Sequence, residues 1–425
     1  MDESAAAKDG RGDRVPTVDF DLLDSQGMRE SNARWDNLRS KCPVAWTEAN
    51  GGAWIASSYD TVTEAFRNWE TFRSGRDVRT VPGPGGSGDY MAAAPIPIQF
   101  PLMVPQDLDP PNWYPYRRVL AELLSPRAAA SLQPRIAHWV TKFLDDVIET
   151  GEYDLMDLTW GIPGAVVLEW LGIPDQERHR VNEAFHNIAA VVPGSPTAEG
   201  ARDELDRVLD LLGQLVIERR AEPREDIISV LANAEVDGKL APLDHAVGML
   251  HLIVGGGVGT TTKLASAAFV HLHYNPDDKA RLINEPKLID GAIEEFLRVY
   301  PPEREQGRTI VEDVELGGCM LRKDDRLIIS EVSACRDEAA FPDADTFVID
   351  RFPNRHVAFG AGMHRCPGSH LARRMFKGML TQVLERMPDY RIKEEALLEY
   401  SNWGHQGGWG SIPITFTPGP RRTDI

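Results

Sequence analysis

Residues 359–368 read Phe-Gly-Ala-Gly-Met-His-Arg-Cys-Pro-Gly, and this stretch decides more about the chain than any other. A single cysteine, Cys366, stands in a segment that three glycines make pliable, because glycine lacks a Cβ and tolerates positive φ. His364 and Arg365 come directly before the cysteine. Positive charge and free backbone N–H groups beside a cysteine favour thiolate over thiol. A helix is predicted to follow over 371–377, and the dipole at its N-terminus would add to that effect.

A lone cysteine in an intracellular protein is usually a small buried hydrophobe, so a ligand role competes with a simpler interpretation. The cysteines at 42, 319, 335 and 366 form no Cys-x-x-Cys pair, which argues against a zinc or iron–sulfur site. One soft anionic ligand on a glycine-rich segment suits the axial bond of a haem iron instead. Phe359, Gly360, Gly362, His364 and Gly368, at these offsets from the cysteine, favour the ligand interpretation.

The pattern Phe-Gly-x-Gly-x-His-x-Cys-x-Gly resembles the haem-binding loop of the cytochrome P-450 family. A second stretch, Glu295-Phe296-Leu297-Arg298 followed by Tyr300-Pro301-Pro302, is similar to another motif of that family. The order of the motifs, their separation and their distance from the C-terminus also match, so the resemblance covers nearly the whole chain. It implies a heme b cofactor with Cys366 as the axial iron ligand, and Phe359, Gly360 and Gly368 beside the haem.

The composition bounds the possible partners. The 425 residues are 42% hydrophobic and 26% charged, which is ordinary for a globular enzyme. A net charge of −19 argues against nucleic acid or an anionic membrane as a partner. The start, Met1-Asp2-Glu3-Ser4-Ala5, lacks the basic and apolar parts of a secretory signal, and no run of 18 apolar residues could span a bilayer. We expect a soluble, cytoplasmic monomer with reduced thiols.

Helical patterns over 114–149, 164–191 and 201–222 indicate a mainly α fold with small β-sheets (α+β). Strands are predicted over 53–56, 314–318, 326–329 and 410–416, the second and third as a pair. We expect a flexible N-terminal segment over 1–16, a single cytochrome P-450 domain over 17–418 and a C-terminal tail over 419–425. By the resemblance, the Gly- and Pro-rich stretch 75–111 covers the substrate pocket and the break at 192–196 is a mobile lid.

The most instructive helix is predicted to begin near Asp244 and to end before Asn275, roughly 30 residues or about 45 Å. Apolar residues surround it on all sides, which is typical of a central helix. It carries glycines at 255–257 and 259, and four interior glycines cost roughly 3–4 kcal/mol relative to alanine. A large flat object against the helix would explain them. The resemblance implies the distal face of haem, with Gly256 in contact; a kinked helix crossing is the alternative.

The resemblance assigns further residues to the haem propionates, which need cationic donors. Arg117, Arg308 and His356 stand at family positions for this role. Trp113 replaces a histidine that many relatives have, although an indole N–H can also donate to a carboxylate. For each of these residues alone, a solvated surface role is the simpler interpretation.

Glu295 and Arg298 are three residues apart on a predicted helix, close enough to pair. The resemblance implies that they form a buried structural network with a downstream arginine, for which Arg351 and Arg355 are the candidates. A surface salt bridge of little energetic consequence is the alternative.

Relatives usually place an acid and then a threonine in the central helix, and here these places hold Gly259 and Thr260. Thr260 is expected to handle oxygen and a water, with Thr261 as the second candidate. The simpler role for Thr260 is a bond to the carbonyl one turn back. Without the acid, protons would come from water or from another acid such as Glu303. Because general acid–base assistance contributes typically 10²–10⁴-fold, we expect Gly259→Asp to raise the coupling of electron input to product.

Substrate contacts are predicted from family positions. Glu303 and Arg304 lie on a segment that borders the pocket in relatives, and we also place Val258, on the central helix, among the contacts. His405, followed by Gln406, falls on another turn expected above the haem. A pocket that contains Arg304 or His405 would favour a substrate bearing a carboxylate or a phenol. Side chains turned outward to solvent are the alternative.

The chain contains no flavin or iron–sulfur motif, so electrons are expected from an external donor. A basic cluster around the cysteine would dock an acidic ferredoxin, and scattered solvated arginines are the alternative. Its members are Arg117, Arg118, Arg127, Arg365, Arg373, Arg374 and Lys377.

The resemblance therefore implies a haem-thiolate monooxygenase that inserts one oxygen atom from O2 into a small organic substrate. A peroxide-driven, dehydrating or coupling haem-thiolate enzyme, suggested by Gly259, is one alternative. A non-catalytic haem sensor is the other.

Overall fold

The computed structural model describes residues 6–8, 14–21, 28–74, 102–190, 197–400 and 408–422. Its α-helices are α1 (Met28–Lys41), α2 (Tyr59–Arg67), α3 (Trp113–Leu123), α4 (Pro126–Ser131), α5 (Gln133–Val147), α6 (Leu155–Leu171), α7 (Asp175–Ala190), α8 (Ala198–Ala221), α9 (Ile227–Ala232), α10 (Leu243–Tyr274), α11 (Pro276–Asn284), α12 (Ile289–Val299), α13 (Glu331–Ala334) and α14 (Ser369–Arg386). Helix is the dominant element, as predicted.

The strands are short and belong to small sheets. They are β1 (Ala6–Lys8), β2 (Arg14–Pro16), β3 (Val44–Thr47), β4 (Ala53–Ala56), β5 (Phe72–Arg73), β6 (Glu152–Asp154), β7 (Glu235–Val236), β8 (Lys239–Leu240), β9 (Glu305–Ile310), β10 (Val314–Leu316), β11 (Cys319–Leu321), β12 (Arg326–Ser330), β13 (Arg391–Ile392), β14 (Leu398–Tyr400), β15 (Gly408–Ser411) and β16 (Pro413–Thr415). The largest sheet has five strands in the order β3-β4-β12-β9-β5, in which β12 and β4 run parallel. The mainly α fold with small sheets is confirmed.

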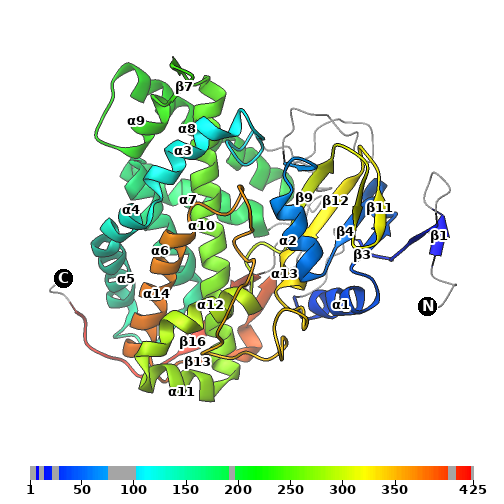
Figure 1. Ribbon diagram of the computed structural model, residues 1–425. Coiled ribbons are helices and arrows are strands. Elements are labelled where there is room, and N and C mark those ends of the chain that lie inside the picture. Colours follow the sequence, from blue (N-terminus) through cyan, green and yellow to red (C-terminus); the bar gives the residue numbers. More distant parts are fainter. Residues whose placement is uncertain are drawn as a thin grey trace.

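The molecule has a large helical part and a smaller part built around the five-stranded sheet (Figure 1). Helix α10 runs through the middle of the helical part, where it packs chiefly against α6 and also against α7, α8 and α14. The segment that leads into α14 passes in front of α10 in this view. The main hydrophobic core lies between these helices and includes Leu250, Val254 and Phe269 of α10.

The predicted central helix is confirmed as α10, which begins after Pro242 and ends at Asn275-Pro276. Proline at 276 cannot continue the backbone hydrogen bonding of α10, and it starts α11 instead, because its missing N–H is not needed at the first position of a helix. The predicted helix over 164–191 is wrong in one respect. Gly172, in the left-handed conformation, ends α6, and a new helix, α7, begins at Asp175.

The predicted pairing of strands 314–318 and 326–329 is also wrong. β10 pairs with β11, its immediate neighbour in the chain, whereas β12 lies between β4 and β9. The predicted strand over 410–416 is two strands, β15 and β16, which belong to different sheets. The stretches 75–101 and 191–196, predicted as pocket cover and lid, lie outside the described residues.

The two ends of the chain carry defined contacts where they are described. β1 and β2 pair as antiparallel strands within the predicted flexible segment. In the predicted tail, Gly419 donates from its backbone to Ile148, and Arg422 binds Glu385 at 2.7 Å. Among the described helices, none combines the length and the hydropathy needed to cross a bilayer.

Candidate functional site

The Cys366 segment is folded tightly against the rest of the chain. The backbone N–H of Cys366 donates to the carbonyl of Phe359 at 2.9 Å, which closes the segment into a loop. Gly360 and Gly362 have φ of 65° and 68°, values that favour glycine strongly over residues with a Cβ. A Cβ on Gly362 would also overlap the carbonyl oxygen of Phe66. The two glycines are therefore required by backbone geometry.

The thiol of Cys366 lies directly before the N-terminus of α14, and a Cβ on Gly368 would stand 3.8 Å from its Sγ. Burial raises the pKa of this thiol, while the Gly368 N–H and the guanidinium groups of Arg117, Arg365 and Arg373 act in the opposite direction. The expectation that the surroundings alone favour the thiolate is therefore wrong. A bound metal ion would overcome the effect of burial, because a coordinating thiol is deprotonated outright.

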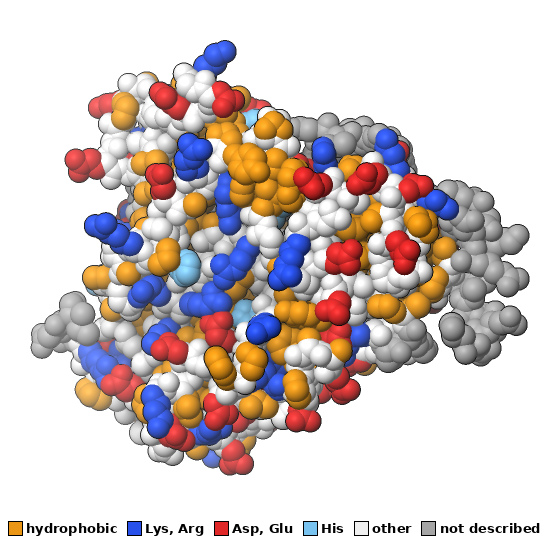
Figure 2. All heavy atoms as spheres, viewed as in Figure 1, with side chains coloured by type: hydrophobic (Ala, Val, Ile, Leu, Met, Phe, Trp, Pro, Cys, Tyr) orange, Lys and Arg blue, Asp and Glu red, His pale blue; other side chains and the backbone are white. Residues whose placement is uncertain are grey.

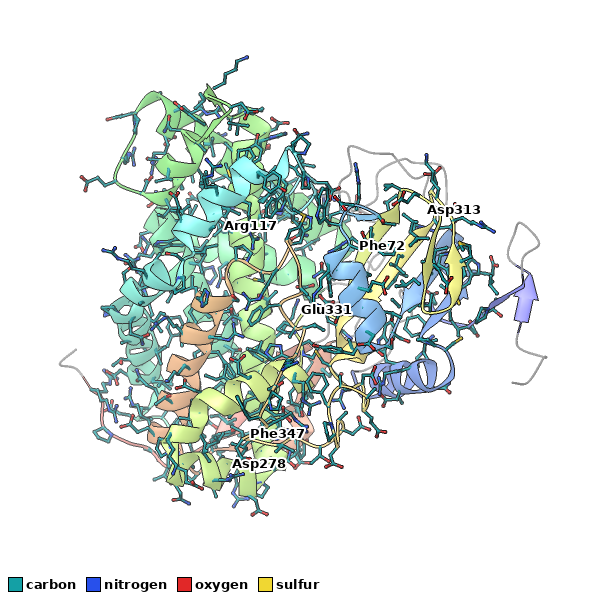
Figure 3. All side chains as sticks on the ribbon, viewed as in Figure 1. Phe72, Arg117, Asp278, Asp313, Glu331 and Phe347 are labelled. Atoms are coloured by element: carbon teal, nitrogen blue, oxygen red, sulfur yellow. The ribbon has the colours of Figure 1, made fainter. Side chains whose placement is uncertain are left out.

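Four side chains gather beside the cysteine segment. The ring of Trp113 lies 5.9 Å from that of His364, and the guanidinium of Arg117 lies 5.6 Å from the Trp113 ring. Arg117 also donates to the carbonyl of Arg365, which ties α3 to the cysteine segment. Figure 3 labels Arg117 on α3, next to that segment.

Arg308 on β9 is the fourth member of this cluster, because its charge and that of Arg117 both act on His364. Burial lowers the pKa of Arg308 to about 10, and burial also lowers the pKa of His364. Asp109 is the carboxylate closest to the imidazole, with its Oδ1 3.6 Å from His364 Nε2, longer than a hydrogen bond. A buried cation such as the Arg308 guanidinium needs an anionic partner in addition to Asp109.

The cluster also offers donors that the described part of the chain does not use. Within that part, the buried Nε1 of Trp113 and the buried Nε2 of His364 have no hydrogen-bond partner. Buried donors without partners are rare in proteins, since each costs about 1–3 kcal/mol. Two arginines, an indole N–H and an imidazole nitrogen fit a pair of carboxylates such as the haem propionates.

The prediction that His356 binds a propionate is wrong. Its Nδ1 accepts from the backbone N–H of Ala358, and its Nε2 donates to Glu294 at 3.1 Å, so both ring nitrogens are engaged within the chain. His364, by contrast, lies beside Trp113 and interacts with the charges of Arg117 and Arg308. In the sequence it is the histidine of the pattern Phe-Gly-x-Gly-x-His-x-Cys-x-Gly, to which the prediction assigned no propionate contact.

Glu295 and Arg298 form a buried network, and neither side chain is exposed. Two hydrogen bonds of 2.7 and 2.8 Å join them. Arg351 binds the same carboxylate at 3.1 and 3.2 Å, whereas the carbonyl of the other candidate, Arg355, accepts from Tyr59. Arg298 also donates to carbonyls at Cys335 and Ala344. The network anchors the segment that leads to the cysteine.

One face of α10 is open at its midpoint. Gly256 is exposed although the helix is otherwise largely buried, and a Cβ on Gly256 or Gly259 would meet no atom within 4 Å. Thr260 stands on the same face, and its Oγ1 donates to the carbonyl of Gly256 at 2.7 Å. The kinked crossing is therefore not the explanation at these two glycines, since nothing packs against them. By contrast, Gly255 faces Phe185 and Gly257 faces Val167.

The structure contradicts two residues predicted for this site. Val258 is 1% exposed and Thr261 is 2% exposed, and both lie on the side of α10 away from Gly256. The reason is the helical period of about 3.6 residues, which turns position 258 to the opposite side from 256. Neither side chain reaches the open face, so Val258 is not a substrate contact and Thr261 is not the second oxygen-handling hydroxyl.

The two predicted substrate contacts before β9 differ in burial. Arg304 is 4% exposed, and its Nε lies 3.9 Å from Glu305, so its charge is balanced within the chain. Glu303 is half-buried. Glu331, labelled in Figure 3 at the junction of β12 and α13, accepts from Gln306 at 2.8 Å. His405 and Gln406 lie outside the described residues.

Comparison with known proteins bears on this site. The family model described as Cytochrome P450 matches residues 173–388. A steroid C26-monooxygenase from Mycobacterium tuberculosis is 30% identical over 409 residues, 95% of this chain and 98% of the relative. The chain belongs to the cytochrome P450 family.

Further relatives agree. Mycinamicin IV hydroxylase/epoxidase from Micromonospora griseorubida is 32% identical and covers 84% of this chain and 88% of its own. Among solved structures, a mutant of P450 EryK in complex with erythromycin B has a TM-score of 0.82 at 26% identity, covering 96% of this chain and 100% of its own. CYP109E1 from Bacillus megaterium, solved with testosterone, has a TM-score of 0.79 at 28% identity, covering 92% and 100%.

Family membership makes the protein an oxidoreductase, a haem monooxygenase that holds its iron through a cysteine thiolate and acts on a small molecule with a redox partner. The residues fit this cofactor. Cys366 offers the sulfur, the Trp113 cluster offers unused donors for carboxylates, and α10 offers an open face. Figure 2 shows Lys and Arg side chains gathered over α3, α14 and the segment before α14.

Proposed function

We propose that Cys366 is the axial ligand of the haem iron, and that the chain oxidises a small organic molecule with electrons from a ferredoxin-type donor. The observation that carries this proposal is the cluster beside Cys366. There, the indole N–H of Trp113 has no partner among the described residues, and the charges of Arg117 and Arg308 act on the neighbouring His364, so these groups could serve two carboxylates. In this reading Arg117, Arg308 and His364 complete the propionate site.

When bound through a thiolate, haem supplies oxygen activation, because the thiolate pushes electron density that favours O–O cleavage. The side chains do the remaining work. The hydroxyl of Thr260 donates its hydrogen bond to the Gly256 carbonyl. The lone pairs of Thr260 Oγ1 therefore remain free to accept a hydrogen bond from a proton donor on the open face. Gly256 and Gly259 keep that face clear of side chains.

We propose a steroid-sized apolar molecule as the first substrate candidate, since the steroid C26-monooxygenases cover nearly the whole chain. The alternative is the predicted substrate with a carboxylate or a phenol. Internal balance of the Arg304 charge weighs against that alternative. A titration of the ferric spin state with testosterone, and with matched acids and esters, separates the two. Tighter binding of acids than of their esters would overturn the apolar proposal.

The electron donor is proposed to dock over α3, α4 and the segment before α14, where Arg118, Arg127 and Arg365 are exposed. Arg373 and Lys377, two members of the predicted basic cluster, contribute less to donor docking, because Arg373 binds Glu294 and Lys377 binds Asp290. We expect the double substitution Arg118→Glu with Arg365→Glu to slow ferredoxin-driven reduction at least tenfold at low salt. Arg207→Glu on α8 is the control and should leave that rate unchanged.

The ligand assignment is tested by the spectrum of the reduced protein with carbon monoxide. A Soret band shifted to the red is expected for the wild type and for Cys319→Ala, which removes a half-buried cysteine elsewhere. Cys366→Ala should lose that band. If Cys366→Ala keeps the full signature, the proposal fails. Product analysis with O2 and reductant, and then with peroxide alone, tests the alternative of a peroxide-driven enzyme.

A further inference from the structure

Lys263 stands on the open face of α10, at a position that the predicted site does not include. It follows Gly259 by four residues and Thr260 by three, so the helical period brings all three to one side of the helix. Lys263 is only 6% exposed. A lysine is almost never this buried without a partner or a purpose.

The direction of helical side chains places this lysine over the turn that handles oxygen. Each Cα–Cβ bond in an α-helix leans toward the N-terminus, so a long side chain covers the turn before its own Cα. For Lys263, that turn contains Gly259 and Thr260. Gly259 has no side chain, and the space beside it is open. The Cα of Lys263 therefore lies one turn after the place where an acid would stand in a relative, on the same side of the helix.

The charge of Lys263 interacts with an acid from a distant part of the chain. Burial lowers the pKa of Lys263 to about 8, and Glu303, before β9, is the carboxylate that opposes this effect. His186 on α7 also interacts electrostatically with Lys263, and its own pKa is lowered by burial and by the lysine. Near neutral pH, Lys263 is thus an ammonium beside an uncharged imidazole.

We propose that Lys263 is the proton donor at the oxygen-handling turn, replacing the acid that Gly259 lacks, with Glu303 as its counter-ion. The inference rests on the proposed function. Monooxygenation consumes one O2, two electrons from the redox partner and two protons, and it yields the oxidised substrate and one water. The Nζ–H of Lys263 gives a proton to the oxygen atom that leaves as water, and the neutral amine then regains a proton from solvent.

The proposal predicts how oxygen is reduced when no organic substrate is added. Two electrons and two protons then yield hydrogen peroxide, whereas four of each yield two waters. A haem-loaded enzyme that lacks its proton donor should release more peroxide per NADH consumed. Three variants are compared with the wild type: Lys263→Met, which removes the amine; Lys263→Arg, which keeps the charge but holds its proton too tightly to give it up; and Lys279→Met, a control in α11 whose amine binds the Tyr390 carbonyl.

We expect both Lys263 variants to raise the peroxide yield per NADH at least fivefold at pH 7, with Lys279→Met unchanged. In the wild type, the yield should rise toward the variant level as pH increases from 7 to 9, because Lys263 loses its proton near pH 8. Without reference to activity, Lys263→Met should melt at a higher temperature than the wild type at pH 7, and this difference should shrink by pH 9.5.

Wild-type peroxide yield in Lys263→Arg would overturn the proposal, because the residue would then act through charge alone. A wild-type yield that does not change between pH 6.5 and 9.5 would also overturn it, even if neither variant folds. Failure of the underlying function looks different. In that case the wild type itself gives no red-shifted Soret band with carbon monoxide, or consumes no NADH with ferredoxin and its reductase.

Discussion

Replacing Glu294 by glutamine tests how the cysteine segment is held in place. The Glu294 carboxylate, on α12, accepts hydrogen bonds of 2.6 and 2.7 Å from Arg373 on α14, and one of 3.1 Å from His356. One side chain thereby joins two helices and the segment that leads to Cys366. Burial by itself would raise the pKa of Glu294, but the hydrogen bonds from Arg373 and His356 outweigh burial and lower the pKa to about 2.

The size of the expected effect follows from that pKa. A lowering from 4.5 to about 2 corresponds to about 3.4 kcal/mol, at 1.36 kcal/mol per pKa unit. The side chain is 31% exposed, so solvent screening reduces this value, and we expect Glu294→Gln to cost about 2 kcal/mol at pH 7. Because the pKa of the folded state is the lower one, the stabilisation is complete above pH 4.5 and disappears as pH falls through about 2.

Urea unfolding of the haem-loaded protein, followed by far-ultraviolet circular dichroism, measures this cost. Asp290→Asn is the matched control, because Asp290 binds Lys377 between the same two helices but is 74% exposed. Exposed pairs contribute little, so the control should cost less than about 0.5 kcal/mol. The reasoning is refuted if Glu294→Gln costs no more than the control. It is also refuted if the difference between Glu294→Gln and the wild type is the same at pH 3 as at pH 7.

Three further substitutions probe the site. Thr260→Val keeps the shape but removes the hydroxyl, and it should raise peroxide release per NADH while NADH consumption continues. Trp113→Phe removes an N–H that has no partner in the described chain, so the melting temperature of the haem-free chain should not fall. Transfer of haem to a scavenger should become about tenfold faster, which corresponds to a lost hydrogen bond of roughly 1.5 kcal/mol. Glu295→Gln leaves the buried guanidiniums of Arg298 and Arg351 without their carboxylate, and should lower stability by about 3–5 kcal/mol in urea unfolding.

The sequence predicted the elements whose signals are local. The central helix was placed to within one residue at each end, because Pro242 precedes it and Asn275-Pro276 follows it. The strand pairing at 326–329 could not be read in the same way. β12 pairs with Trp54 and Ile55 of β4 on one side and with β9 on the other. The alternation of apolar and polar residues within a strand does not show which distant strand it pairs with.

The site residues show the same difference between local signals and distant partners. The cysteine segment, Arg308 and Trp113 followed from motifs, since each stands at a fixed place in a recognisable stretch. His356 was assigned wrongly because its partner, Glu294, is distant in the chain, and the competition between two acceptors for one imidazole is visible only in three dimensions. The misassignment of Val258 was avoidable, because the helical period alone turns it away from Gly256.

Gly259 and Lys263 together define a final prediction. A side chain at 259 would meet open space, so Gly259→Asp can be made without disturbing the packing. In the presence of Lys263, the new carboxylate stands one turn before the ammonium and pairs with it, which raises the pKa of the lysine. We therefore expect the pH at which peroxide release rises to shift upward from about 8. At pH 7 the gain in coupling should be small, in contrast to the gain that the sequence alone predicts for this substitution.

The same substitution has a larger expected effect when Lys263 is absent. In Lys263→Met, the carboxyl introduced by Gly259→Asp becomes the donor nearest to Thr260, and the double variant should return to the wild-type peroxide yield. If the double variant releases as much peroxide as Lys263→Met alone, a donor on this face of α10 does not control how oxygen is reduced. The missing acid and the buried lysine would then be unrelated features of one helix.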